Sequence, residues 1–466
     1  MSAAGALLAG VRILLILAVA ARVSGRRLPP AAVWAVSLLA LVAVLASAFG
    51  ADSYSVDARV FWTAGRDVRD GADPYARPEL LNPPSALPFF VILSLLPLSA
   101  FLVFWKVAGL AGYGALVPLS RGALRGAPGE TTDEIAPTDL LLLSAAVLAS
   151  VAAQFGVLIG QLPFVTALAS IGAVGCRAKG RPVAAGLLLA VAAIKITTML
   201  PLLLLFLRRQ DLKTWATLAL SGFALAFLAV RPTQLAEVLR RNWSNISLSN
   251  APGATNDYSF AGPHSADLVG LNLAVYHLGV RDRTLVDGLS LVIVALLGLW
   301  VAWQLYRRPA LAHAPAAAIV TCYASIFVYH RVYDTVLLAL PLVYAFSRGL
   351  VETGRARWGY RACALGLLGV LFEPVKVLER FQRFSQGHGL AGRMVEALCL
   401  PAATWILLAA VVGLTLVERR RRLNYPASAG REHLVCGIQR RRDRKADAHW
   451  PDHGIPAAFR GIVNSD

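Results

Sequence analysis

The sequence predicts an all-α, polytopic membrane protein, and three observations lead to that prediction. Apolar residues make up 57% of the 466-residue chain and charged residues only 15%, whereas soluble proteins carry roughly 25% charged residues. Apolar runs of about 15–25 residues recur from Leu7 to Val417, and a helix needs about 20 residues to cross a bilayer. The runs lack the alternation of a membrane barrel, so only helices satisfy their backbone hydrogen bonds in lipid.

The net charge of +18 is concentrated in short loops between the apolar runs. The positive-inside rule predicts that such loops face the cytoplasm. This distribution argues against nucleic-acid binding and favours a multi-pass protein of the plasma (inner) membrane, and the Ala/Arg/Leu-rich composition is typical of bacteria. The loops contain Arg22, Arg26 and Arg27; Arg177, Lys179 and Arg181; Arg208, Arg209 and Lys213; Arg307 and Arg308; Arg355, Arg357 and Arg361; and Arg419 to Arg422.

Leu7–Val23 contains Arg12 and is followed by no convincing cleavage site, so we interpret it as a helix rather than a signal peptide. Ala31–Gly50 is the first clear span. The total is about 10–13 transmembrane or re-entrant helices. The later segments are 85–97, 99–119, 138–153, 162–176, 183–194, 198–207, 214–230, 284–306, 313–328, 335–347, 361–375 and 394–417.

Two regions do not fit full-length crossings. Residues 85–119 must end on the side opposite their start, which two full spans would not do. Residues 182–208 lie between two basic loops and leave too little chain for two crossings of about 20 residues each. We therefore predict half-length or re-entrant helices there, and such irregular segments at membrane depth usually line a cavity.

The chain is predicted to form one membrane domain over residues 1–422, followed by a basic, disordered cytoplasmic tail over 423–466. Arg231–Arg283 is the longest polar insertion, and its centre, Asn242–His264, is predicted to be an ordered loop over the bundle. Four of the five cysteines lie in or beside apolar runs with no metal-ligand spacing, so they are expected to be small packed residues.

Counting crossings from the basic loops places four polar segments on one extracytoplasmic face. They are the 51–82 loop, the Gly160-Gln161 turn, the 231–283 loop and the Tyr329–Asp334 segment. Because solubility does not require polar groups to converge there, we expect the functional site on that face.

The 51–82 loop contains a predicted amphipathic helix at the membrane surface. Val60, Phe61, Ala64 and Val68 recur at the three- and four-residue spacing of one helix face. Asp57 lies at the amino end of this helix. It is either a helix cap, for which aspartate is favoured, or a general base positioned at the water–lipid boundary to take a proton from an acceptor hydroxyl.

These residues carry a resemblance to glycosyltransferase family 87, whose members are polyprenyl-phosphate-sugar-dependent membrane mannosyltransferases of the GT-C type. The resemblance extends over residues 30–350. The chain differs from the family pattern at Asn82 and at Leu162-Pro163, which bears on sugar specificity. The matching motifs are Asp57 before Phe61-Trp62-x-Ala64, Gly71-Ala72-Asp73-Pro74-Tyr75, Pro83-Pro84, Pro97-Leu98, Gly160-Gln161, Gly180-Arg181-Pro182, Ala185-Gly186, Lys195 before Pro201, and Tyr329-His330-Arg331-x-Tyr333-Asp334.

The resemblance implies a GT-C helical bundle that transfers a sugar, expected to be mannose, from a polyprenyl-phosphate-sugar donor. The acceptor would be a lipid or a glycan on the extracytoplasmic side. In this scheme Asp57 is the general base, and the anomeric configuration is inverted. The lipid-linked donor is a co-substrate, and no other cofactor and no metal ion are predicted.

The departing phosphate needs cations, and Lys195, His330 and Arg331 are the predicted donor-phosphate ligands. Lys195 has no acidic neighbour in sequence, and a lone lysine in the membrane costs about 2.5–3.5 kcal/mol. A lipid phosphate would supply its counter-charge; the alternative is a lysine that reaches the membrane surface. Asp334 would pair with Arg331, and His330 alone could be a hydrogen-bonded interfacial histidine.

The remaining predicted site residues have side chains suited to sugar hydroxyls. Two other classes of function remain open at this stage: a transporter or flippase for a lipid-linked saccharide, which should show an inverted repeat, and a non-catalytic isoprenoid-binding scaffold. The predicted partners are the donor, the acceptor and membrane lipids. The predicted sugar- or acceptor-binding residues are Gln161, Tyr75, Asn256, Tyr258, His264, Tyr333 and Asp334.

Overall fold

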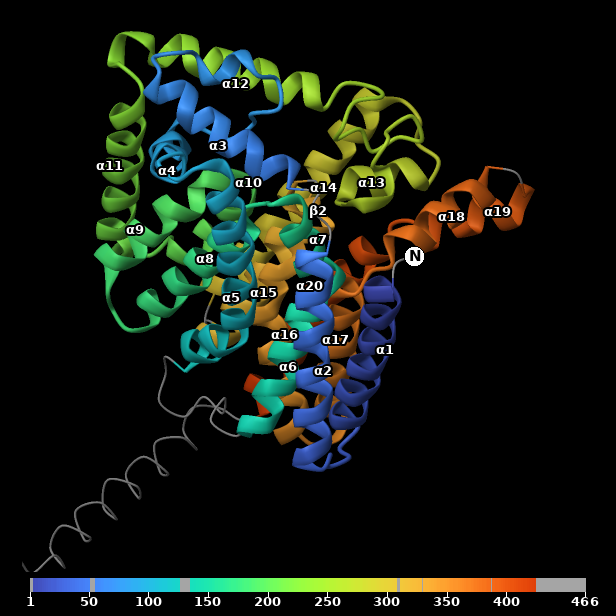
Figure 1. The fold of residues 1–466 in the computed structure, drawn as a ribbon. Coiled ribbons are helices and arrows are strands. Elements are labelled where there is room, and N and C mark those ends of the chain that lie inside the picture. Colours follow the sequence, from blue (N-terminus) through green and yellow to red (C-terminus); the bar gives the residue numbers. More distant parts are fainter. Residues whose placement is uncertain are drawn as a thin grey trace, which may run out of the picture. The chain divides into compact units, whose positions relative to one another are not determined.

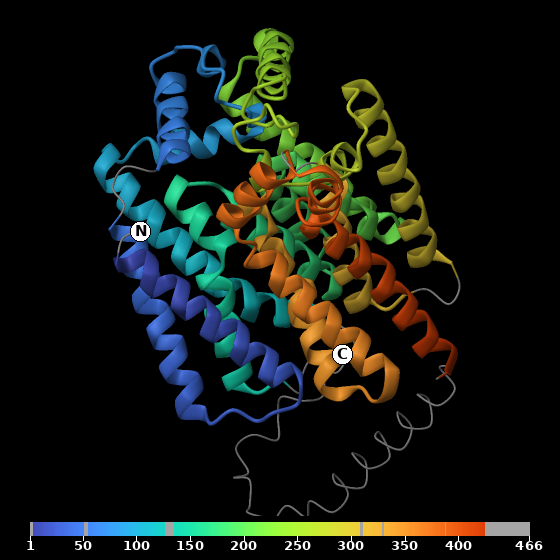
Figure 2. The ribbon, with the colours of Figure 1, turned by 90° about the vertical axis from the view of Figure 1, so that its right-hand side faces the viewer.

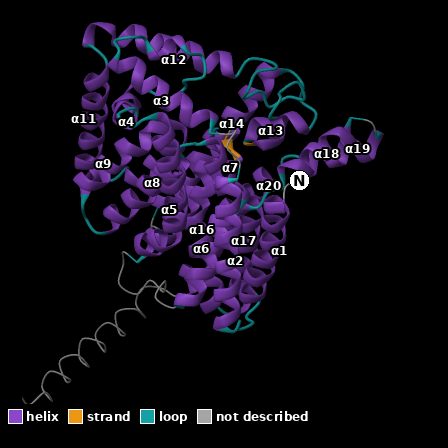
Figure 3. Ribbon diagram, in the orientation of Figure 1, coloured by secondary structure: helices purple, strands orange, loops and turns teal. Residues whose placement is uncertain are grey.

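The computed structural model describes residues 3–50, 55–125, 135–307, 311–328, 330–386 and 388–424. Within these residues nearly every regular element is a helix, and the strands are two dipeptides, β1 (Leu268–Val269) and β2 (His330–Arg331), paired antiparallel (Figure 3). The predicted all-α membrane bundle is confirmed. Residues 1–417 form one compact unit and a second begins at Glu418; most of the predicted tail, 425–466, lies outside the described residues.

Within the described residues, eight helical segments are long and apolar enough to cross a membrane, and a ninth is a pair bent by 49°. Length and composition alone define this set. The eight are α1 (Ala3–Val23), α2 (Pro30–Phe49), α5 (Leu98–Leu124), Pro182–Phe206, Arg209–Ala229 with α11 (Leu212–Ala229), α14 (Arg283–Tyr306), Val332–Val351 with α16 (Ala339–Val351), and α20 (Ala402–Asn424); the bent pair is α6 (Pro137–Ala149) with α7 (Val151–Ile159), and shorter apolar helices include α8 (Pro163–Ala178) and α15 (His313–Phe327).

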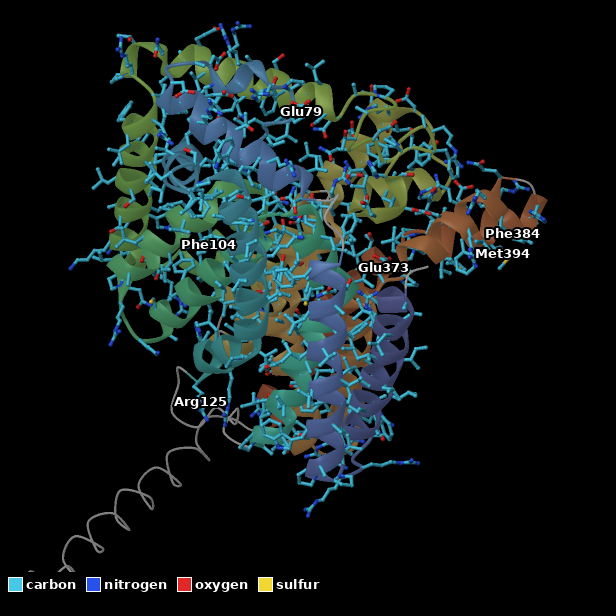
Figure 4. All side chains as sticks on the ribbon, in the orientation of Figure 1. Glu79, Phe104, Arg125, Glu373, Phe384 and Met394 are labelled. Carbon is cyan, nitrogen blue, oxygen red and sulfur yellow. The ribbon has the colours of Figure 1, made fainter. Side chains whose placement is uncertain are left out.

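The helices of the first unit run between two ends of different character (Figures 1 and 2). One end carries α3 (Val56–Arg69) and the polar insertion, and we call it the α3 face. The other end carries the basic loops, where Arg22 pairs with Asp139 at 2.6 Å and Arg361 donates to the carbonyl of Ser24. Figure 4 labels Glu79 and Arg125 at these opposite ends.

Residues 85–119 are not two full spans. The first stretch is the seven-residue helix α4 (Leu87–Leu93), preceded by the turn η2 (Pro84–Ala86), and only α5 is long enough to cross. Pro97 is the N-cap residue of α5, and the Pro84 and Pro97 positions confine α4 to two turns. One short helix and one full span explain how the segment changes sides.

Residues 182–208 form a re-entrant hairpin. The chain rises in α9 (Pro182–Ala192), breaks at η4 (Ala193–Lys195) and α10 (Ile196–Met199), and returns in η5 (Leu200–Phe206). Length and hydropathy would allow this segment to be one span. However, Arg177 before it bonds Asp211 after it at 3.3 Å and lies over the ring of Phe206. The two ends therefore meet on the same side, as the spacing of the basic loops predicted.

The polar insertion is more helical than expected. The predicted loop Asn242–His264 begins inside α12 (Leu235–Ser249), which lies across the α3 face with α3 beneath it (Figure 1). A short turn, η8 (Ser265–Asp267), and α13 (Leu271–His277) follow. Asn245 fixes α12 to the turn below by donating to the carbonyls of Tyr75 and Arg77.

The predicted spans 361–375 and 394–417 both need correction. The first belongs to α17 (Gly354–Leu371), and the second is divided between α19 (Gly389–Leu398) and α20. Between them, α18 (Val375–Ser385) and α19 form an amphipathic hairpin that exposes apolar side chains, among them Phe384 and Met394 (Figure 4). Because α18 and α19 contain many polar residues, a simple count of apolar residues does not reveal these two helices.

Candidate active site

The amino end of α3 is held tightly against the turn after α7. Gly160 has φ +77°, and a side-chain Cβ there would lie 2.4 Å from the Cβ of Ala58, so only glycine allows this approach. The amide of Ser55 donates to the carbonyl of Leu158 at 2.6 Å, and the indole of Trp105 donates to the carbonyl of Gly160. The Gly160-Gln161 turn is therefore built to dock α3.

The residue spacing predicted an apolar face on α3, and the structure packs this face on α4. Phe61 and Ala64 are buried, and the rings of Phe61 and Phe90 stack with centroids 4.9 Å apart. A Cβ at Gly65 would lie 2.0 Å from the carbonyl oxygen of Phe90, so a glycine is required where the two helices cross. These contacts fix the position of Asp57 one turn away.

Asp57 accepts a hydrogen bond from the side-chain amide of Gln161 at 2.5 Å. The N-cap residue of α3 is Ser55, and no side-chain cap hydrogen bond is present, so the carboxylate of Asp57 does not act as a helix cap. Burial raises the pKa of Asp57, and this effect outweighs the Gln161 hydrogen bond and the positive charges of Arg331 and Lys195, which lower it. A half-buried carboxylate with a raised pKa is suited to take a proton.

Lys195 has an acidic partner, contrary to the expectation from its sequence neighbours. Its ammonium donates to both carboxylate oxygens of Asp334, at 2.6 and 2.8 Å, and lies 4.8 Å from the centroid of the Tyr333 ring. The partner is 139 residues away in the chain. Asp334 thus supplies the counter-charge that we had assigned to a lipid phosphate, and Lys195 is not a lysine that merely reaches the surface.

Arg331 does not pair with the side chain of Asp334 as predicted. Its guanidinium donates to Asp267 at 3.1 Å and to the amide oxygen of Asn256 at 3.2 Å, and only its backbone N–H reaches Asp334. The β1–β2 pairing explains this choice, because it sets Leu268 opposite Arg331 and so brings the preceding Asp267 within reach. Tyr329, at the start of the predicted motif, lies outside the described residues.

His330 is buried beside the ion pair. Its Nε2 lies 2.9 Å from the carbonyl of Ala324, and its Nδ1 lies 3.6 Å from a carboxylate oxygen of Asp334, with no hydrogen-bond partner within the described residues. The hydrogen bond to Ala324 fits the alternative of a hydrogen-bonded histidine, and the position beside Asp334 fits a role at the site.

The structure separates the other predicted residues into three places. Tyr333 lies inside the charged cluster, by which we mean Asp57, Lys195, Asp267, Arg331 and Asp334. Its ring stacks on that of Phe155. Tyr75 is buried under α12, where its hydroxyl donates to the carbonyl of Asn82, so it holds the loop rather than facing the cluster. Tyr258 lies further out and donates to Asp287, and His264 is exposed on the loop before Asp267.

Sequence reasoning missed Asp267, and it named Asn82 only as a departure from the family pattern. The side-chain amide of Asn82 donates to the carbonyl of Ile194, which ties the first loop to the break that carries Lys195. Neither residue belongs to a recognisable sequence motif. An acidic residue next to a short apolar pair in the 231–283 loop is the only signal that could have indicated Asp267.

The charges in this cluster are nearly balanced. Two cations, Lys195 and Arg331, face the three carboxylates of Asp57, Asp267 and Asp334. Burial also raises the pKa of Asp267, and the positive charge of Arg331 opposes that effect. An anion that enters the cluster must therefore share the two cations with carboxylates that already hold them. No group of three or more His, Cys, Asp or Glu side chains in the described part of the chain could hold a metal ion.

Fold and site together define a class: an integral membrane protein with a buried carboxylate and two ion-paired cations at one end of a helical bundle. The sequence comparison then gives the family. The profile of glycosyltransferase family 87 matches residues 80–329, more than half of the chain, and the chain belongs to that family of membrane glycosyltransferases. No curated protein and no solved structure matches it.

The matched region contains only part of the cluster. Gln161 and Lys195 lie inside it, whereas Asp57 precedes it and Asp334 follows it. The fold brings all four together, through the Asp57–Gln161 and Lys195–Asp334 contacts. Asp57 and Asp334, which lie outside the matched region, are thus each bonded to a residue inside it.

Proposed function

We propose that this membrane glycosyltransferase uses Asp57 as the general base for transfer of a sugar, expected to be mannose, from a polyprenyl-phosphate-sugar to a lipid or glycan acceptor. The observation that carries the proposal is the Asp57 carboxylate, held by Gln161 at 2.5 Å and near two cations. A base contributes most when its pKa lies near the working pH, and burial moves that of Asp57 upward.

The reaction balances as follows. The acceptor hydroxyl gives its proton to Asp57, its oxygen bonds to the anomeric carbon, and the bond from that carbon to the phosphate oxygen breaks. The products are the glycosylated acceptor, with inverted configuration, and polyprenyl phosphate. Lys195, Arg331 and His330 are the groups that would stabilise the negative charge on the departing phosphate. They would share that charge with Asp334 and Asp267, which hold the cations in place beforehand.

The location of the site supports an extracytoplasmic reaction at the bacterial inner membrane. The candidate residues lie at the α3 face, and basic contacts such as Arg22–Asp139 and Arg177–Asp211 lie at the other end. The positive-inside rule assigns the basic end to the cytoplasm. A polyprenyl donor in the outer leaflet would then present its phosphate at the depth of Lys195, where the helix of the re-entrant hairpin is interrupted.

The test is transfer of labelled sugar from polyprenyl-phosphate-mannose to extracted lipids by protein reconstituted in vesicles. Asp57→Asn should lower the rate by about 10²–10⁴-fold, because asparagine keeps the contact with Gln161 but cannot accept the proton. Asp70→Asn, an exposed change on the neighbouring C-cap of α3, is the matched control and should keep the full rate.

Two outcomes contradict the proposal. Full activity in Asp57→Asn would exclude this base, and a reaction driven by a nucleotide sugar alone would exclude the donor. Movement of a lipid-linked saccharide across the vesicle without sugar transfer would instead favour the transporter or flippase alternative.

A further inference from the structure

A second region, lined by apolar side chains and a few polar ones, lies beyond Arg331. It is a cavity of about 500 Å³ between α12, the segment 250–258, α14 and the end of α15. Ligand sites in proteins commonly measure about 300–1,000 Å³. Asn256 lines the cavity and accepts from Arg331, so the cavity and the charged cluster share a wall.

Among the described residues that line the cavity, none carries a positive charge without an acidic partner. Its one cation, Arg283, lies 3.5 Å from Asp257 and 4.0 Å from Asp287 and also donates to the carbonyl of Asn250. Asp287 further accepts from Tyr258 and Asn272. A phosphate placed here would meet the Asp287 carboxylate and a guanidinium that Asp257 and Asp287 already neutralise, so the donor headgroup is disfavoured.

The cavity does present neutral hydrogen-bonding groups that lack partners. Ser290 is 5% exposed, and its hydroxyl has no hydrogen-bond partner among the described residues. A buried serine in a helix normally bonds the carbonyl four residues before it. The side-chain oxygen of Asn250 is also unpaired within that part of the chain, and the exposed indole of Trp243 forms part of the lining. Amide, hydroxyl and aromatic groups together suit sugar hydroxyls and the apolar faces of sugar rings.

The deeper wall of the cavity is apolar and lies within a membrane span. Arg283 begins α14, and Val294 lies 11 residues further along, about 16 Å deeper at 1.5 Å per residue. That depth is close to half of the roughly 30 Å hydrocarbon core. Leu291 lines the same wall and is 70% exposed on the outer surface of α14. A ligand that fills this cavity therefore needs an apolar tail as well as a polar head.

We propose that the cavity binds the acceptor, and that the acceptor is a lipid with a neutral, hydroxyl-rich head group rather than a free glycan. This inference rests on the proposed sugar transfer, for which it supplies the second substrate. The head group lies against Trp243, Asn250 and Ser290, and the tail leaves between the helices along Leu291 and Val294. The shared wall at Asn256 places this substrate next to the charged cluster.

The test is photolabelling, which needs no turnover. Protein in nanodiscs is irradiated with a dodecyl mannoside that carries a diazirine in its tail, and the labelled peptides are mapped by mass spectrometry. We expect labels in the α14 segment around Leu291 and Val294. Unmodified dodecyl mannoside should compete, whereas methyl mannoside and dodecyl phosphate at equal concentration should not.

Three variants make the result specific. Ser290→Leu, which fills the cavity, and Trp243→Ala, a change at an exposed residue that should not disturb folding, should each weaken labelling about tenfold, or about 1.4 kcal/mol. Val292→Phe is the matched control on the same helix, because Val292 is 55% exposed and does not line the cavity. It should label like the wild type.

Asp57→Asn should also label fully, so a failure of the catalytic proposal would leave this result intact. Equal competition by dodecyl phosphate would assign the cavity to the donor, and equal competition by methyl mannoside would indicate a soluble acceptor. Labelling that is insensitive to both Ser290→Leu and Trp243→Ala would show only general contact with lipid. Each of these outcomes overturns the inference.

Discussion

The segment Val332–Val351 and the helix α14 are both apolar stretches of spanning length, yet they occupy opposite environments. In the first, 89% of the residues are buried inside the bundle, whereas in α14 only 28% are, and α14 is the more apolar of the two. The more apolar helix is the outer one, as its position at the edge of the bundle also indicates (Figure 2). Lipid selects for apolar surface on an outer helix, while an inner segment can hold polar groups that its neighbours satisfy.

The two segments also divide the proposed chemistry between them. The inner segment carries Asp334, whose carboxylate is 4% exposed and pairs with Lys195. The outer helix carries Ser290 and Val294 on the wall of the neutral cavity. The inner segment thus carries a buried charge, whereas the deeper wall of the cavity, formed by Leu291 and Val294 of α14, is apolar.

The largest expected effect comes from breaking the inner ion pair. Asp334→Ala leaves the half-buried ammonium of Lys195 without a counter-charge and should destabilise the protein by about 3–5 kcal/mol. Thermal unfolding in detergent measures this loss. The double variant Lys195→Met with Asp334→Ala should recover most of the stability while transfer stays abolished; no recovery would mean that the pair is not the cause.

A matched pair of leucines tests the burial difference directly. Leu340→Ala, at a fully buried position on the inner segment, should cost about 2–5 kcal/mol, because the removed atoms leave a cavity. Leu296→Ala, on α14 at 62% exposed, should cost less than about 0.5 kcal/mol, since lipid fills the space. Equal losses in unfolding experiments would contradict the inner and outer assignment.

The pH dependence of transfer should follow the ionisation of Asp57. Because burial raises its pKa, the rate should increase with pH through a midpoint above the ordinary aspartate value of about 3.9. Gln161→Leu removes the hydrogen bond that lowers this pKa, so its midpoint should lie at higher pH than that of the wild type. Rate measurements across pH on both proteins test this, and a shift in the opposite direction would exclude the assignment.

The same ionisation should affect stability with the opposite sign. A carboxyl group whose pKa is raised in the folded state stabilises that state below its unfolded pKa, and the contribution is lost as the pH rises through the folded pKa. Wild type should therefore lose stability relative to Asp57→Asn as the pH rises through this range. Unfolding of both proteins at several pH values measures the difference.

The smallest effect is expected at the periphery of the α3 face. Arg66 and Asp70 form an ion pair in which both side chains are 60% exposed, and such pairs contribute about 0–1 kcal/mol. Asp70→Ala should change the unfolding temperature little and leave transfer intact. A loss comparable to that of Asp334→Ala would remove the contrast between buried and surface charge.

Several features of the site could be predicted because they depend on nearby residues. The spacing of Phe61 and Ala64 gave the buried face of α3, and the Gly160-Gln161 turn was recognised as a polar point on the same face. The short interval between basic loops gave the re-entrant hairpin at 182–208. In each case the signal lies within one helix or one loop.

The partners of the charged residues could not be predicted in the same way. Lys195 was expected to lack an acid and Arg331 was expected to bond Asp334, yet the pairs are Lys195–Asp334 and Arg331–Asp267. The strand pairing that selects Asp267 is only two residues long. The amphipathic α18–α19 hairpin was missed because it is neither apolar enough for a span nor separated from its neighbours by a long polar segment.

The sequence by itself determined that this chain crosses the membrane many times, where most helices lie and to which family it is similar. Those properties follow from hydrophobic length and from the need of backbone groups in lipid for partners within the same helix. Only the tertiary structure decided which spans are central, which carboxylate holds each cation and where a neutral cavity opens. Those choices depend on contacts between distant segments, such as the 139 residues that separate Lys195 from Asp334, and local composition carries no record of them.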